Sequence, residues 1–151
     1  MSFLFRFDSI LQLRRRQRDE VGSAVGKANE AIQRIDLEIE EIEKERIDAA
    51  KKAAEGRVGT VSVDSLLSTG RYDLQLQADT NALQETRAKL VQELERRQAA
   101  LQVAEAELKR FEKLEDNEKK AYQAELLRRE QLESDDANSR RFTIQRQREN
   151  Q

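Results

Sequence analysis

Apolar residues along this chain recur at alternating spacings of three and four positions, in two long stretches. A mean spacing of 3.5 residues keeps one helix face turned toward a partner helix, which is typical of a left-handed coiled coil. We call the positions on this face the seam; arginines occupy several of them. The first stretch of the seam comprises Phe7, Leu11, Arg14, Arg18, Val21, Val25, Ala28, Ile32, Ile35, Ile39, Ile42, Arg46, Ala49 and Ala53. The second comprises Leu76, Thr80, Leu83, Arg87, Leu90, Leu94, Arg97, Leu101, Ala104, Leu108 and Phe111.

One segment between the two stretches is typical of a connection. Residues 56–73 hold Gly56, Gly59 and Gly70 together with several serines and threonines. We therefore expect an all-α fold, a long two-helix antiparallel coiled-coil hairpin that forms a single domain over 1–151. The predicted parts are helix one at about 8–55, helix two at about 74–135 and a flexible basic tail at about 136–151.

A symmetric connection also predicts which residues face each other. Their numbers then add to about 129, which places Ile35 near Leu94 and Arg14 opposite Glu115. In one interpretation Arg14 and Glu115 form an ion pair that sets the register more than it stabilises the fold. In the other, Arg14 extends outward to solvent from a frayed seam. The residues leave both interpretations open.

The composition argues against an enzyme. With 37% hydrophobic and 38% charged residues, the chain has enough apolar side chains for a seam but few for a layered core. Histidine and cysteine are absent, no phosphate-binding Gly-rich element ending in Lys occurs, and the abundant carboxylates lie on a solvated helix face. We expect no catalytic residues, no metal and no cofactor. The lack of cysteine fits a reducing compartment such as the cytoplasm.

The charges are unevenly distributed. Residues 1–18 carry five arginines and one acid, and residues 140–151 carry four arginines and one acid, whereas 19–55 and 74–139 are net acidic. A hairpin would bring both basic segments to its open end. Guanidinium groups suit carboxylates and phosphates, but the pI of about 5.5 and the 5% aromatic content favour a protein partner over nucleic acid. The alternative is a solubilising basic tail.

The amino terminus holds three phenylalanines at alternate positions. On a helix, Phe3 and Phe7 would lie together and Phe5 nearly opposite. They act either as a hydrophobic staple at the helix start or as an apolar plug for a partner. Arg6 and Asp8 interrupt this segment, so we predict no direct membrane insertion.

A second group of apolar residues lies off the seam. These residues either widen the seam or form a surface for a partner helix. Ile47 is the best candidate for partner contact, because it lies near the predicted tip beside Leu74 and Leu76. The group consists of Leu37, Ile47, Val91, Val103, Leu114 and Leu127.

The amino-terminal sequence begins a distinctive run at Phe5, Arg6 and Phe7 that continues to Arg16 and is followed by Asp19, Glu20, Ala24, Ala28 and Ala31. This run resembles the opening of the flagellar export protein FliJ family. That family begins with Phe, a basic residue and Phe, followed by a polar residue, a Leu-rich run with Arg, and an Ala-rich helix. The carboxyl-terminal part is similar to the family's ending in Lys119, Lys120, Ala121, Tyr122, Glu125, Arg128, Arg129, Glu130, Gln131, Arg140, Arg141 and Phe142.

The resemblance implies a non-enzymatic cytoplasmic component of the flagellar type III export apparatus, similar to the stalk subunit of rotary ATPases. It implies three partners, namely the hexameric export ATPase, the cytoplasmic domain of the export gate and the export chaperones. In the family the open end inserts into the ATPase and promotes ring assembly. Carried onto this chain, the ATPase-facing candidates are Phe5, Phe7, Leu11, Leu13, Arg14 and Arg16; the gate-facing candidates are Ile47, Leu74 and Leu76.

This chain departs from the family in its glycine-bearing connection and in having Tyr72 as its one aromatic residue near the tip, which places the gate contacts in question. One alternative is the equivalent stalk of a virulence injectisome. Another is an unrelated coiled-coil scaffold or nucleic-acid-binding protein. A scaffold would pair its seam with a second copy, whereas the stalk interpretation predicts a monomeric hairpin bound peripherally at the inner face of the membrane.

Overall fold

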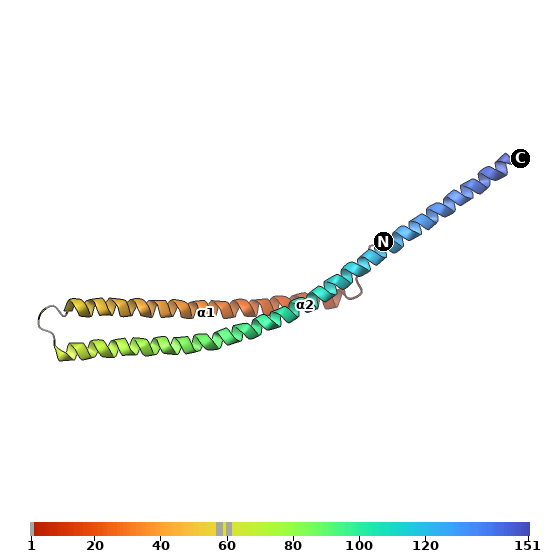
Figure 1. Ribbon diagram of the computed structural model, residues 1–151. Coiled ribbons are helices and arrows are strands. Elements are labelled where there is room, and N and C mark those ends of the chain that lie inside the picture. Colours follow the sequence, from red (N-terminus) through yellow and green to blue (C-terminus); the bar gives the residue numbers. More distant parts are fainter. Residues whose placement is uncertain (1, 57–58, 60–61) are drawn as a thin grey trace. The chain divides into compact units, whose positions relative to one another are not determined.

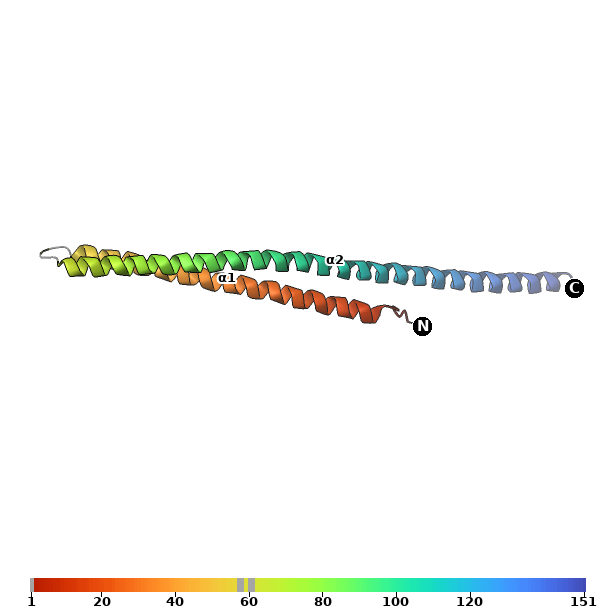
Figure 2. The same cartoon turned by 90° about the horizontal axis from the view of Figure 1, so that it is seen from below.

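The computed structural model describes residues 2–56, 59 and 62–151, and within them the chain is all-helical. It forms α1 (Asp8–Gly56) and α2 (Val63–Glu149). The chain divides into two compact units. The hairpin unit is Arg18–Ala104, and the terminal unit is Met1–Gln17 together with Glu105–Gln151. In the hairpin unit the two helices lie side by side and antiparallel, which confirms the predicted helical hairpin (Figures 1 and 2).

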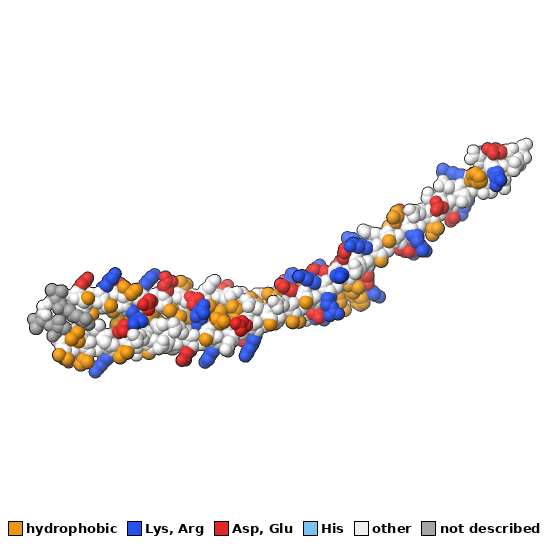
Figure 3. Space-filling model, viewed as in Figure 1, with side chains coloured by type: hydrophobic (Ala, Val, Ile, Leu, Met, Phe, Trp, Pro, Cys, Tyr) orange, Lys and Arg blue, Asp and Glu red, His pale blue; other side chains and the backbone are white. Residues whose placement is uncertain are grey.

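The predicted seam is the contact face between the helices. Within each unit, every seam position named above is buried or partly buried. The most deeply covered residues of the hairpin unit are Ala28, Ile32, Ile35 and Leu76. In this unit, hydrophobic side chains gather along the line where the helices meet, and charged side chains flank it (Figure 3). The apolar repeat therefore supplies a narrow strip of hydrophobic contact along the pair.

Arginines within the seam reach across to the opposite helix. Arg46 Nε donates a hydrogen bond to Asp73 Oδ1 at 2.9 Å, and Arg87 Nε donates to Asp36 Oδ1 at 2.6 Å. These hydrogen bonds raise the pKa of both arginines. Arg97 Nη1 donates to the carbonyl oxygen of Ala24 at 2.8 Å. A long side chain at the edge of a narrow seam thus keeps its charge paired or solvated.

The observed register differs from the one expected from sequence. Asp36 faces Arg87, whereas the expected register would place it opposite Glu93. For this pair the displacement is six residues, close to one heptad, so the same faces still meet. The cause is a connection shorter than predicted, because α2 begins at Val63 rather than at about residue 74.

A serine cap explains the early start of α2. Ser62 Oγ accepts a hydrogen bond from the Ser65 backbone N–H at 3.1 Å, which satisfies one of the free donors at the helix start. The helix then continues through Gly70, although glycine costs a helix interior about 1 kcal/mol relative to alanine. Packing of α2 against α1 outweighs this local preference. Gly59, with φ of 112°, adopts a conformation that favours glycine.

The expected tail is also helical. α2 extends through residues 136–149 and ends with Arg146 and Arg148 in its last turn, where positive charge is favourable. After Gly70 the chain contains no further glycine or proline to interrupt the helix. From residue 123 onward every described residue is exposed, so within the terminal unit this part of α2 packs against no other described segment.

Reversal of one cross-helix pair tests the register. Arg87→Asp and Asp36→Arg should each lower the melting temperature by about 1–2 °C, because each places like charges together, and the double variant should restore it. Circular dichroism melts measure the effect. Coupling of position 36 to position 93, with none to position 87, would contradict the observed register.

Candidate functional site

The three amino-terminal phenylalanines precede the first helix. α1 begins at Asp8, and the Phe7 carbonyl accepts the hydrogen bond from the Leu11 N–H at 2.9 Å. The Asp8 N–H in turn donates to the Phe5 carbonyl at 3.2 Å, which closes a turn. Since these residues are not helical, their alternate spacing does not force Phe5 away from Phe3 and Phe7.

The phenylalanines form a cluster with α2 in the terminal unit. Phe5, Leu11 and Leu108 are buried at its centre. The rings of Phe5 and Phe7 meet edge to face with centroids 5.8 Å apart. The partly buried residues around this centre are Phe3, Phe7, Phe111 and Leu114. We call this set the aromatic cluster. It supports the staple interpretation, because it fastens the start of the chain to α2.

Two contacts extend the cluster toward the carboxyl terminus. The ring of Phe3 lies 5.7 Å from that of Tyr122. Arg6 Nε donates to Glu118 Oε1 at 3.1 Å, and its guanidinium lies 4.6 Å from the Phe7 ring centroid. Beyond Phe111, Glu115, Glu118 and Tyr122 are partly buried at seam spacing, although two of them are charged. The seam continues along this part of α2 because Phe3 and Arg6, which precede α1, cover it.

Arg14 does not form the ion pair considered from sequence. Instead of pairing with Glu115, its Nη1 donates to Gln17 Oε1 at 3.0 Å, and its guanidinium carbon lies 5.8 Å from the Phe111 ring centroid. The one-heptad change of register moves Glu115 away from the position opposite Arg14. The Nε atom of Arg14 is buried and has no hydrogen-bond partner among the described residues.

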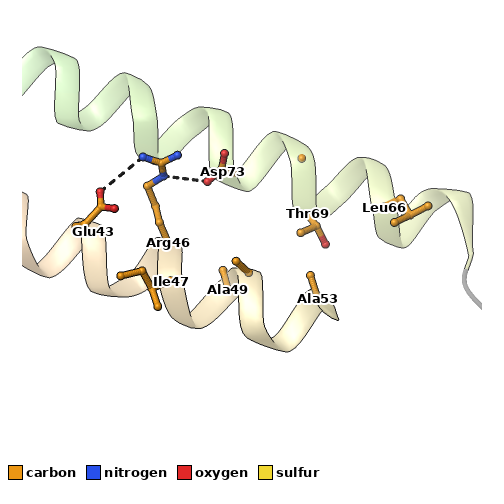
Figure 4. Close-up of a pocket in the computed structure, with 10 residues that line it drawn as sticks. Glu43, Arg46, Ile47, Ala49, Ala53, Leu66, Thr69 and Asp73 are labelled. Carbon is orange, nitrogen blue, oxygen red and sulfur yellow. Dashed lines mark hydrogen bonds and ion pairs between the residues drawn. The ribbon is translucent and has the colours of Figure 1, made fainter. Parts of the chain in front are cut away.

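The hairpin unit carries a second candidate site near its tip. A hollow of about 520 Å³ lies between the end of α1 and the start of α2. Small side chains line its floor, since Ala49 and Ala53 point from α1 toward α2 and Thr69 points back (Figure 4). Arg46 closes one end through its contacts with Glu43 and Asp73. Beside the hollow, Ile47 is 49% exposed and Leu74 is 65% exposed, whereas Leu76 is 6% exposed.

Tyr72 is another exposed group near the tip. Its hydroxyl donates to Glu45 Oε2 at 3.3 Å. The negative charge of Glu45 raises the tyrosine pKa, with smaller contributions from desolvation and from the hydrogen bond. The phenol therefore stays neutral and remains a hydrogen-bond donor.

Among the residues that the structure describes, no cluster of three or more His, Cys, Asp or Glu side chains is arranged to hold a metal ion. No described helix is long and apolar enough to cross a membrane.

The family model for the flagellar FliJ protein matches residues 2–148. The chain belongs to the flagellar FliJ family. It is therefore a flagellar protein related to export. No curated protein and no solved structure matches the chain. The family match includes both the aromatic cluster and the exposed part of α2. The alternative of a coiled-coil scaffold unrelated to this family is therefore excluded.

Of the six residues predicted to face an ATPase, Arg14 is partly buried as described above, and the other five fall into two groups in this FliJ-family chain. Phe5 and Leu11 are buried and Phe7 packs against them, so these side chains hold the terminal unit together. Leu13 is 50% exposed and Arg16 is exposed, so both are available to a partner. The sequence placed Glu118 near Leu11, whereas its observed partner is Arg6, and it did not predict that Phe5 clusters with Leu108. Arg6 and Phe5 come from before α1, which no helical repeat describes.

Truncation of Leu11 tests the aromatic cluster. Leu11 is 1% exposed, so Leu11→Ala should lower the free energy of unfolding by about 2–5 kcal/mol through lost contacts and a cavity. The matched control is Leu13→Ala, which should change it by less than about 0.5 kcal/mol because that side chain is half exposed. Urea unfolding followed by circular dichroism measures both. Equal effects of the two variants would contradict the burial of Leu11.

Proposed function

We propose that this FliJ-family chain is a non-enzymatic cytoplasmic stalk that binds the hexameric flagellar export ATPase and promotes assembly of its ring. The observation that carries the proposal is the terminal unit, where the aromatic cluster fixes an arginine-rich segment against α2. Such a rigid basic surface suits a protein ring lined with carboxylates. The stalk would thereby lie peripherally at the inner membrane face, held there by the export apparatus.

The ATPase contact is assigned to the exposed side of α1 in this unit. Leu13 provides an exposed apolar side chain, and Arg14 is followed by the partly exposed Arg15 and the exposed Arg16. Phe5, Phe7 and Leu11 support this surface from inside. Their loss would weaken binding by loosening the segment, whereas changes at Leu13 or Arg16 would act on the contact itself.

The export gate is assigned to the tip of the hairpin unit. Ile47 and Leu74 are exposed beside the hollow and supply an apolar surface for the cytoplasmic domain of the gate. Leu76 is buried against α1 and would support that surface without touching the partner. Escort of export chaperones completes the proposed role. It rests on family membership rather than on a particular surface.

A monomeric hairpin is the proposed state of the free chain. In the hairpin unit the seam of α1 is covered by α2, so the apolar strip that a second copy would need is already used. The equivalent stalk of a virulence injectisome would look similar. The match to the flagellar FliJ family favours the flagellar system, and binding to one or the other ATPase separates them.

Titration of the chain into the flagellar export ATPase of its own organism tests the proposal. Wild type should raise the hydrolysis rate and promote hexamer formation, while Leu13→Glu and Arg16→Glu should lose at least about tenfold in potency because both lie at the contact. Thermal melts establish that these variants are folded. Lack of binding and of stimulation by wild type would contradict the stalk function.

Ile47→Glu serves as the control in this titration. It lies in the hairpin unit and is assigned to the gate, so it should stimulate the ATPase as wild type does while losing binding to the gate domain. A matched loss of ATPase stimulation by Ile47→Glu would instead place the ATPase contact at the tip.

A further inference from the structure

Arg14 differs from every other arginine at the predicted seam. The others donate a hydrogen bond from Nε to a carboxylate at 2.6–3.1 Å. These pairs are Arg18 with Asp19, Arg46 with Asp73, Arg87 with Asp36 and Arg97 with Glu93. Arg14 has a buried Nε without a partner among the described residues, and its hydrogen bond runs from Nη1 to Gln17.

The Nε atom of Arg14, which has no hydrogen-bond partner among the described residues, belongs to the edge of the guanidinium group that commonly binds carboxylates. A guanidinium receives two carboxylate oxygens along the edge formed by Nε and Nη2. Arg87 shows this arrangement in the same chain, with Nε 2.6 Å from one oxygen of Asp36 and Nη2 3.5 Å from the other. In Arg14, Gln17 occupies only Nη1, so the Nε and Nη2 edge lacks a carboxylate. A buried unpaired donor costs free energy that an incoming acceptor would recover.

Arg14 also lines a hollow in the terminal unit. Its volume is about 300 Å³. Phe111 and Leu114 supply apolar walls, and Arg110, whose Nη1 lies 3.5 Å from Glu107 Oε1, stands at the rim. The lining thus combines an apolar surface with an unpaired cation. This combination fits the methylene and carboxylate groups of an acidic side chain.

We infer that Arg14 and this hollow receive an aspartate or glutamate side chain of the export ATPase. The inference rests on the proposed stalk function and names the chemistry of its ATPase contact. Charge complementarity supports it, because residues 1–18 carry five arginines against one acid. A phosphate dianion fits less well than a protein carboxylate, since Glu107 at the rim repels the greater charge. The Arg14 side chain rotates on binding to expose Nε.

Binding measurements with three variants test the inference. Arg14→Gln should weaken binding to the intact ATPase at least about tenfold, because the partner carboxylate is left desolvated without its cation. Arg14→Lys should recover part of that loss, since lysine supplies the charge but not the fork. Arg34→Gln makes the same change of charge at an exposed position of α1 in the hairpin unit and should bind as wild type does. Thermal melts must show that all three are folded.

Carbodiimide cross-linking identifies the carboxylate directly. In the complex, the amine of the Arg14→Lys variant should form an amide with an Asp or Glu of the ATPase that is absent from the wild-type complex, as read by mass spectrometry. A new cross-link to Glu107 or Glu115 of the same chain would overturn the inference. Unchanged binding by Arg14→Gln, with wild type bound, would overturn it while leaving the stalk function intact. Failure of wild type to bind would overturn both.

Discussion

The structure depends on one strip of contact, the seam that α1 and α2 share. Its residues are mostly half-buried rather than buried, because two helices cannot enclose a core as a layered domain does. The strip must therefore be long to be stable, which the 49 residues of α1 provide. Arginine is tolerated in it because solvent lies within reach of a long side chain. Within each unit, its part of the seam positions that unit's candidate site.

The heptad repeat determined which residues face inward but not which residues face each other. A shift of α2 by one heptad brings the same kind of face into contact, so the apolar pattern alone fits both registers. What distinguishes the registers is the start of α2 and the polar pairs across the seam. The Ser62 cap and the helical run through Gly70 shorten the connection, and the pairing of Arg87 with Asp36 accompanies the resulting register. Glycine, serine and threonine in that segment favoured a loop locally, and tertiary packing outweighed them.

The sequence also directed attention to the amino terminus. Its phenylalanines and arginines were singled out as candidate contacts, and the family match extends over them. Their geometry was not predictable from helical periodicity, because residues before Asp8 fold back as a turn. For this reason Phe5 became a core residue rather than an exposed plug. Arg14 does not pair with Glu115 because the register differs from the expected one. The lack of a hydrogen-bond partner for its buried Nε atom could be seen only in the structure.

Site-specific photo-cross-linking of the chain to the export ATPase tests the central claim most directly, namely that the terminal unit is the ATPase-binding part. A photoreactive residue replaces Leu13, Arg16, Ile47 or Leu74 in turn, all of which have exposed side chains. Binding through the terminal unit should give cross-links to the ATPase from positions 13 and 16 and none from positions 47 and 74. Cross-links from the tip positions, with none from the terminal unit, would contradict it.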